Sequence, residues 1–219
     1  MTPAGDLTTR LLTWLKPEQA GLDLVAYFRE PTTAADTSIF SGRHFERLGG
    51  GGDHPSIANR FTAEDLIAVQ TLSIAVPPEA SVAILHGHLG RQLADRLASI
   101  PNGISLSDPA AGAEVADGSP AKEAWDLLND TTGIGWVTAG KLLARKRPHL
   151  IPVYDQVVSC ALGSPRQFWR SLHATLSAPD SAVRSRIEEL RQFAPCTVSD
   201  LRILDVVVWM GHRRDHANC

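Results

Sequence analysis

The sequence has few cysteines and no long apolar run. Its three cysteines, Cys160, Cys196 and Cys219, are far apart, with no Cys-x-x-Cys pair and no group of four. This argues against a disulfide framework, a structural zinc site and an iron–sulfur cluster. No apolar stretch approaches the roughly 20 residues that cross a bilayer, and the N-terminus lacks the basic start and apolar stretch of a signal peptide. We therefore expect a soluble, cytoplasmic protein with no membrane partner, no metal and no cofactor.

Aromatic residues and excess positive charge are also scarce. Only 6% of the 219 residues are aromatic, which disfavours a base-stacking platform for single-stranded nucleic acid. The chain has 21 Lys and Arg against 24 Asp and Glu, a net charge of −3, so a nucleic-acid partner would need a local basic face. The hydrophobic fraction, 43%, is large enough to form a core and excludes disorder of the whole chain.

Helical periodicity is present in most of the chain, and strand-like alternation is absent. The pattern predicts an all-α protein. Two weakly structured stretches, 41–59 and 101–118, are expected to be loops between helical blocks. We expect an N-terminal segment, 1–60, with a helix and a glycine-rich polar loop, and a helical core, 61–219, with the two packed together as one compact unit. Predicted helices after residue 60 begin at Thr62 and Trp136 and cover 82–97, 120–129, 156–162, 166–176, 181–193 and 199–209.

Two of these helices have recognisable start signals. Thr62 is followed by Asp65 at the spacing of a capping box, in which each side chain bonds the other residue's backbone amide. Ser119 precedes Pro120, and proline is favoured at the first position of a helix because its missing amide hydrogen would be unpaired there.

A tight turn at Gly133-Ile134-Gly135 leads into the helix that begins at Trp136. The free amides at such a helix start can bind a phosphate. Four basic residues follow, and residues 131–154 contain no acid, so this segment carries a local charge of +4. The sequence therefore predicts a DNA-binding face formed by Gly133, Ile134, Gly135, Thr138, Lys141, Arg145, Lys146 and Arg147. The alternative for the turn is an ordinary connection between two helices.

The segment 133–139, Gly-Ile-Gly-Trp-Val-Thr-Ala, and the segment 153–158, Val-Tyr-Asp-Gln-Val-Val, resemble the helix-hairpin-helix DNA glycosylases of base-excision repair. That family has a G-h-G-x-x-T-A hairpin followed after about twenty residues by an aspartate, and here Asp155 comes eighteen residues after Val137. The resemblance covers about 28 residues and implies a glycosylase-like helical fold. The chain as a whole also resembles an uncharacterised family of actinobacterial type.

The resemblance implies that Asp155 stabilises the cationic sugar formed when a flipped base is released. Asp155 directly precedes a predicted helix, and the dipole of that helix would favour the ionised form of its carboxyl group. The alternative is that Asp155 only caps this helix. Val137 stands where strand-cleaving members have a Schiff-base lysine, so no lyase step is expected. Lys141 lies one turn later and is expected to be solvated or to contact phosphate.

Further candidates are weaker. Asp65 precedes Gln70-Thr71 by the spacing that the general acid has in adenine-excising members, which implies an acid role for Asp65 and a DNA-wedge role for Gln70. The capping box explains Asp65 equally well.

The polar segment before and within the four-glycine run 49–52 could be a mobile lid, formed by Arg43, His44 and Glu46, or a solvated loop. His212 and His216 have a His-x₃-His spacing but no cysteine pair near them, so no metal is expected there.

Three functions remain open from the sequence. The first is a DNA glycosylase that removes a base without cleaving the strand. The second is a non-catalytic helical module that binds duplex DNA or a protein partner. The third is an enzyme that acts on a free nucleoside or another small metabolite. The sequence gives no oligomeric state.

Overall fold

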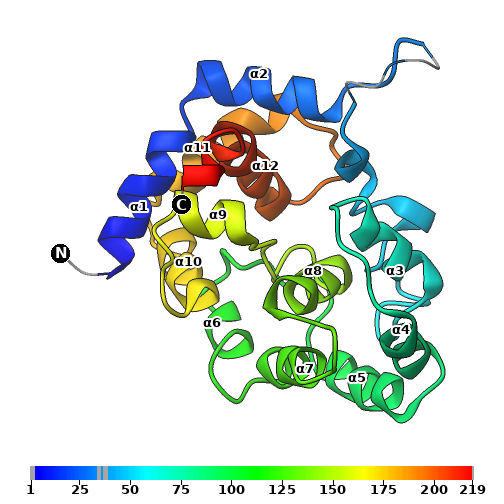
Figure 1. The fold of residues 1–219 in the computed structure, drawn as a ribbon. Coiled ribbons are helices and arrows are strands. Elements are labelled where there is room, and N and C mark those ends of the chain that lie inside the picture. The colour runs from blue at the N-terminus through cyan, green and yellow to red at the C-terminus, as the bar shows by residue number, and fades with distance from the viewer. Residues whose placement is uncertain (1–2, 34–35, 37–38, 219) are drawn as a thin grey trace.

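The computed structural model describes residues 3–33, 36 and 39–218, and every regular element among them is a helix. This confirms the predicted all-α class. The helices form two groups that face each other across the middle of the molecule (Figure 1). In the described part of the chain, no helix is both long enough and apolar enough to cross a membrane.

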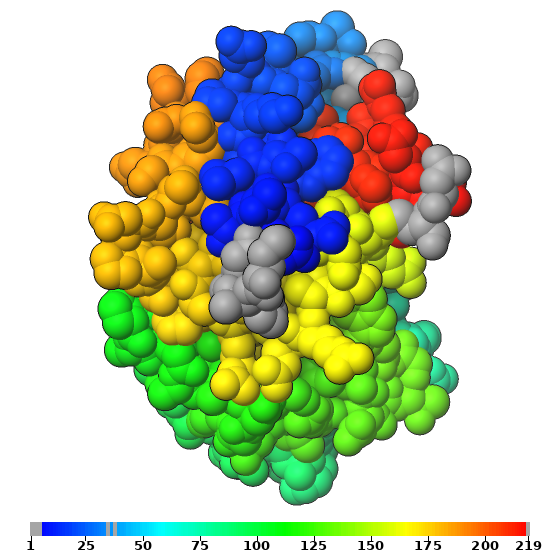
Figure 2. All heavy atoms as spheres, turned by 90° about the vertical axis from the view of Figure 1, so that its left-hand side faces the viewer, coloured from blue at the N-terminus to red at the C-terminus, as the bar shows by residue number. Residues whose placement is uncertain are grey.

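The first group joins the two ends of the chain. Its members are α1 (Pro3–Trp14), α2 (Pro17–Phe28), α10 (Phe168–Leu176), α11 (Ala182–Leu190) and α12 (Asp200–His212). Figure 2 shows the N-terminal helix lying between segments from the C-terminal third of the sequence. Leu7, Leu11 and Leu24 are buried in this interface. The N-terminal helices therefore share a core with α10–α12, although more than 130 residues separate α2 from α10.

The second group is formed by the middle of the chain. Its members are α3 (Ala63–Gln70), α4 (Pro78–Leu85), α5 (His88–Ala98), α7 (Pro120–Asn129) and α8 (Trp136–Lys146). Here α4 packs on α5, α5 on α7, α7 on α8, and α8 on α3. The short helices α6 (Ala111–Glu114) and α9 (Gln156–Ala161) pack on the first group, α6 on α10 and α9 on α12. Four 3₁₀ turns complete the fold: η1 (Ser41–His44), η2 (Leu48–Gly50), η3 (Arg191–Phe193) and η4 (His216–Asn218).

The predicted helix starts are confirmed by hydrogen bonds. The capping box is present, with the Thr62 amide donating to Asp65 Oδ2 at 3.0 Å. The Ser119 hydroxyl accepts from the Lys122 amide at 3.2 Å at the start of α7. These local signals are readable in the sequence because a cap and its partner lie three residues apart.

The prediction of one helix over 82–97 is wrong, because the chain turns between α4 and α5. Gly87 begins α5 with an extended backbone, and a Cβ added there would lie 2.6 Å from the carbonyl oxygen of Ala83. At Gly90 an added Cβ would lie 2.0 Å from the carbonyl oxygen of Ile84. Both glycines therefore allow α5 to fold back against the end of α4, and the apolar pattern continues through the turn.

Candidate functional site

A pocket of about 440 Å³ lies where α8, α9 and α12 meet η1 and the turn that follows α3. This volume is in the range typical of small-ligand sites. The lining combines carboxylates, cations and aromatic rings, contributed by both helix groups: Asp155, Asp205, Lys141, Arg202, Tyr27, Phe40 and Trp209. A pocket between two helix groups with convergent polar side chains is the best candidate site in the described part of the chain.

Asp155 lies at the N-terminus of α9 and lines this pocket. Its Oδ1 accepts a hydrogen bond from the Val158 amide at 3.1 Å, which confirms the predicted helix cap. Its Oδ2 lies 3.2 Å from Lys141 Nζ. The side chain keeps 14% of its surface exposed. Capping and ion pairing therefore hold this carboxylate in one orientation at the pocket wall.

Lys141 points from α8 into the same pocket, and its side chain is only 5% exposed. Besides Asp155, its ammonium donates to the carbonyl oxygen of Leu72 at 3.2 Å. The prediction that Lys141 is solvated is therefore wrong, and its contact with a phosphate stays a prediction. Val137, one turn earlier on the same face of α8, also lines the pocket.

Three aromatic rings, those of Tyr27, Phe40 and Trp209, pack against one another in the lining. Tyr27 and Phe40 stack with their centroids 5.1 Å apart and their planes 11° from parallel. Trp209 meets Phe40 edge-on at 5.8 Å. The Arg213 guanidinium lies 5.0 Å from the Phe40 centroid. Together these rings give the pocket an apolar part, against which a planar ring can pack.

Arg202 and Asp205 form a buried ion pair one turn apart on α12. Arg202 also donates to the carbonyl oxygen of Gly42 at 3.0 Å and to the hydroxyl of Tyr27. Burial raises the pKa of Asp205 to about 7, although the Arg202 charge opposes this effect. Asp205 is therefore a carboxyl group that can gain or lose a proton near neutral pH inside the pocket.

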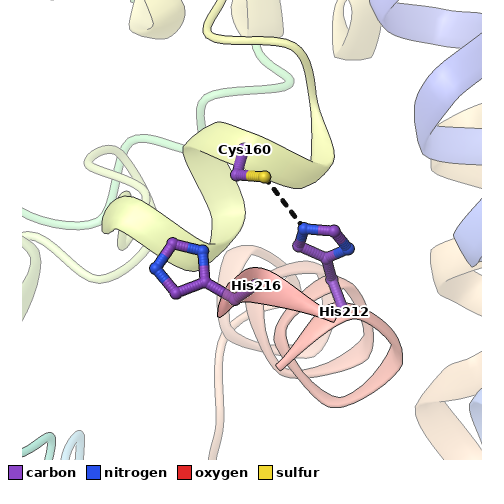
Figure 3. A group of neighbouring side chains, drawn as sticks. All are labelled: Cys160, His212 and His216. Atoms are coloured by element: carbon purple, nitrogen blue, oxygen red, sulfur yellow. Dashed lines mark hydrogen bonds between the residues drawn. The ribbon is translucent and has the colours of Figure 1, made fainter. Parts of the chain in front are cut away.

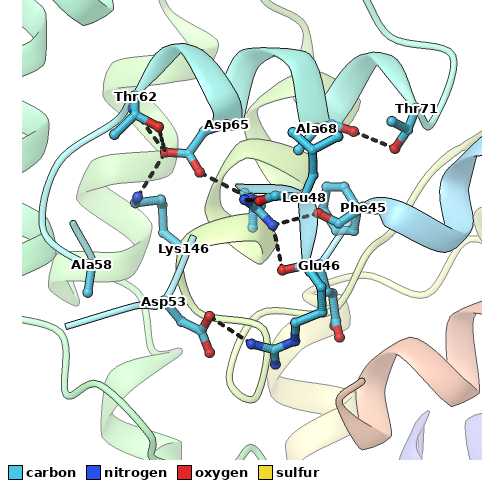
Figure 4. Close-up of polar contacts among 12 residues, drawn as sticks. Phe45, Glu46, Leu48, Asp53, Ala58, Thr62, Asp65, Ala68, Thr71 and Lys146 are labelled. Atoms are coloured by element: carbon cyan, nitrogen blue, oxygen red, sulfur yellow. Dashed lines mark hydrogen bonds and ion pairs between the residues drawn. The ribbon is translucent and has the colours of Figure 1, made fainter. Parts of the chain in front are cut away.

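The basic run at the end of α8 is not on the surface. Arg145, Lys146 and Arg147 are at most 2% exposed, so the prediction that they form a DNA-binding face is wrong. Arg145 Nε lies 3.0 Å from Asp65 Oδ1, and Lys146 Nζ lies 2.8 Å from Asp65 Oδ2 (Figure 4). Arg145 also donates to the carbonyl oxygen of Phe45 at 2.8 Å. These cations hold α3 and the segment that follows η1 against α8.

Arg147 plays a similar structural part on the other side of α8. Its guanidinium donates to the carbonyl oxygens of Ala58 at 2.8 Å and Ile100 at 3.1 Å, and to the side-chain oxygen of Asn59 at 2.8 Å. Burial lowers the pKa of Arg147 to about 10, with Asp53 opposing the shift. The side chain therefore connects the predicted loop 41–59 and the chain just after α5 to the end of α8.

Asp65 is fully enclosed and does not line the pocket. One of its carboxylate oxygens accepts from Arg145, and the other accepts from Lys146 and from the Thr62 amide. The prediction of a general-acid role for Asp65 is therefore wrong, because its oxygens already have partners and no substrate can reach them.

The segment predicted as a mobile lid is anchored in the fold. Glu46 is buried and accepts from the amide of Ser199 at 2.8 Å and from its hydroxyl at 2.6 Å, at the start of α12. Arg43 pairs with Glu30 at 2.6 Å, whereas His44 is exposed. An added Cβ at Gly52 would lie 2.4 Å from the carbonyl oxygen of Arg145. The lid prediction is wrong, since the glycine run allows close packing around Arg145.

The hairpin residues are partly accessible. Gly133 and Gly135 are exposed, whereas Ile134 and Thr138 are buried. Gly135 is the N-cap of α8, and a Cβ added there would have no atom within 4 Å, so a ligand can approach this backbone. Gln70 is exposed at the end of α3, beside the turn whose residues 71–74 line the pocket. Contacts of the hairpin and of Gln70 with DNA stay predictions.

Burial changes the charge that the surface presents. Of the described charged residues, five Lys and Arg are buried but only three Asp and Glu. The accessible surface is therefore more acidic than the net charge of −3 suggests. Electrostatic attraction to a DNA backbone is correspondingly weaker than the sequence predicts.

The family of the chain follows from a match along most of its length. A family model described as a family of unknown function, DUF6308, matches residues 20–212. The chain belongs to this family. Comparisons with curated proteins and with solved structures found no match. The region that matches DUF6308 contains every residue that lines the pocket except His216. The resemblance to helix-hairpin-helix glycosylases stays a prediction beside this result.

Several pocket residues of this DUF6308 member were missed by the sequence analysis. Asp205 follows Arg202 by three residues within an otherwise apolar helix, and an ionisable pair in such a context is a signal of a buried site that could have been used. Tyr27 and Phe40 gave no signal, because they reach the pocket only through the packing of the N-terminal helices on α12.

A second hollow, of about 400 Å³, lies on the other side of the α8–α9 connection. Tyr154 turns into it, whereas its neighbour Asp155 faces the first pocket. Trp136 and Phe168 pack beside Tyr154, with centroid distances of 5.6 and 4.0 Å. This hollow contains few polar groups and is a poorer candidate for chemistry.

Proposed function

We propose that this protein hydrolyses the N-glycosidic bond of a nucleobase bound in the central pocket, with a flipped nucleotide of DNA as the substrate. The observation that carries the proposal is the position of Asp155. Its carboxylate is fixed at a helix N-terminus and lines a pocket whose aromatic part can hold a planar base. The resemblance of the segments 133–139 and 153–158 to DNA glycosylases supports the same function.

The proposed chemistry divides between two carboxyl groups. When the bond between the sugar and the base breaks, positive charge develops on the sugar, and the Asp155 carboxylate would stabilise it electrostatically. The leaving base needs a proton, and Asp205, whose burial raises its pKa to about 7, is the candidate donor. Water then adds to the sugar carbon and loses a proton to solvent. Val137 in place of a lysine leaves no amine there for strand cleavage.

Lys141 is proposed to position Asp155. Its ammonium lies 3.2 Å from the carboxylate and 3.2 Å from the Leu72 carbonyl oxygen, so it links α9 to the turn after α3. We expect Lys141→Met to slow the reaction by misplacing Asp155.

DNA would be held mainly by the hairpin backbone. The exposed amides near Gly133 and Gly135 border the pocket through Val137, whereas the basic run is buried. Few phosphates would then be neutralised by side chains, so we expect binding with a shallow dependence on salt.

A second candidate substrate is a free nucleoside. The burial of five cations and the acidic surface favour it, because a nucleoside needs no basic face. Both substrates use the same pocket and the same carboxylates, and they differ in whether the hairpin contributes.

Base release from matched substrates tests both candidates. The purified protein is incubated with duplexes that contain uracil, alkylated purines, oxidised purines or mismatches, and with the corresponding nucleosides, and free base is measured by chromatography. We expect release by the wild-type protein and a loss of about 100-fold or more in Asp155→Asn, which keeps a good helix-capping residue. Asp53→Asn, at a residue that does not line the pocket, is the control and should retain activity.

Three results would count against the proposal in different ways. Release from nucleosides alone would favour the second substrate. DNA binding without release of any base would favour a non-catalytic module that binds DNA. Equal activity in Asp155→Asn and the wild-type protein would contradict the role of Asp155.

A further inference from the structure

Three metal-binding side chains meet at one end of the first helix group. Cys160 lies on α9, His212 is the last residue of α12, and His216 begins η4 (Figure 3). One ligand atom from each lies within 4.8 Å of the other two, and all three residues are partly buried. Cys160 Sγ and His212 Nε2 are 3.0 Å apart. Segments more than 50 residues apart thus bring a sulfur and two imidazoles together.

We propose that Cys160, His212 and His216 bind a zinc ion in the reduced protein. A thiolate and two imidazoles are ligands that Zn²⁺ favours, and tetrahedral coordination at the usual bond lengths separates ligand atoms by about 3.5 Å. The observed separations range from 3.0 Å, between Cys160 Sγ and His212 Nε2, to at most 4.8 Å, so zinc binding needs the ligand atoms to shift by about 1 Å. On binding, the Cys160 thiol releases its proton to solvent.

The state of Cys160 decides when this site exists. Cys160 is disulfide-bonded in the structure, and a disulfide sulfur is not a thiolate ligand. Metal binding is therefore expected only after reduction by a thiol or phosphine. Cys219 lies outside the described residues, and the three-ligand site does not depend on it.

The zinc ion would join two parts of the pocket wall. Cys160 is on the helix that Asp155 caps, and His212 ends the helix that carries Asp205 and Trp209. His216 itself lines the pocket. The metal would thus hold α9 against α12 and stabilise the pocket, whatever substrate the pocket accepts. The proposal differs from the sequence-based expectation of no metal, which relied on the absence of a cysteine pair at ligand spacing near the two histidines.

Metal content tests the site directly. The protein is reduced with a phosphine, incubated with Zn²⁺, freed of excess metal and analysed for bound zinc. We expect about one equivalent in the wild-type protein and in Cys196→Ser, which removes the exposed cysteine, and less than a tenth of that in Cys160→Ser and His216→Ala. The control His54→Ala, at an exposed histidine, should bind like the wild-type protein.

A second measurement does not depend on the folding of the variants. Replacement of Zn²⁺ by Co²⁺ in the reduced wild-type protein should produce a thiolate-to-cobalt charge-transfer band and the visible absorption of a tetrahedral site. Zinc retention in Cys160→Ser equal to that of the wild-type protein, no retained zinc in the reduced wild-type protein, or a cobalt spectrum without the thiolate band would each overturn the assignment.

Discussion

Replacing Asp65 with asparagine should destabilise the protein strongly, because this carboxylate is the acidic partner of two buried cations. Asp65, Arg145 and Lys146 have fully buried side chains, with ion-pair distances of 3.0 and 2.8 Å. Removing one partner of a buried ion pair costs about 3–5 kcal/mol, since the remaining charge stays desolvated. Asparagine has a similar shape, so most of this cost comes from the charge. We expect a loss of about 4 kcal/mol, which lowers Tm by about 10 °C in a chain of this length.

Urea denaturation followed by circular dichroism measures this loss. Asp53→Asn is the matched control, because Asp53 pairs with Arg47 at 3.1 Å but both side chains are partly exposed. Exposed pairs contribute about 1 kcal/mol or less. The double variant Asp65→Asn/Lys146→Met should recover at least about 1 kcal/mol relative to Asp65→Asn, because it removes one unpaired cation beside Phe61. Equal stability of Asp65→Asn and Asp53→Asn would refute the reasoning.

Two further predictions concern the hairpin and the pocket. Gly133→Ala should lower the free energy of unfolding by about 1–3 kcal/mol, because Gly133 has φ of 83° and an added Cβ would lie 2.7 Å from Pro77. Gly135→Ala should lower it by under about 1 kcal/mol, because Gly135 has open space around it and a negative φ. Thermal melts of the two variants measure this difference. The pKa of Asp205 is raised from 3.8 to about 7, so the folded state holds a proton that the unfolded state releases. This contribution to stability is complete below pH 3.8 and is lost as the pH rises through 7. Thermal melts between pH 4 and 8 should therefore show a steeper loss of Tm in the wild-type protein than in Asp205→Asn, and parallel curves would contradict the assigned protonation.

The parts of the fold that the sequence predicts correctly depend on neighbours close in the chain. The caps at Thr62, Ser119 and Asp155 bond amides three residues later, so residue type and spacing are sufficient to recognise them. The turn at Gly87 was missed because the apolar residues on either side keep a helical spacing, while the close packing that requires glycine involves α4 and α5 together.

The errors about the site have a common physical cause. A run of basic residues is normally solvated. The partners that make the burial of Arg145 and Lys146 tolerable are Asp65 and carbonyl oxygens of the segment that follows η1, and they lie 80 or more residues away in the sequence. Only the folded chain shows these contacts. Asp155 was identified from its motif, whereas Lys141 was assigned to the surface because its carboxylate partner lies across the α8–α9 connection.

The release of free base by the wild-type protein and by Asp155→Asn tests the central claim most directly. With the duplex and nucleoside substrates described above, we expect at least one substrate to yield free base. Asp155→Asn should lower the rate of release by about 100-fold or more, while its melting curve stays close to that of the wild-type protein. Base release that is equal in the two proteins, or absent with every substrate, would contradict the claim.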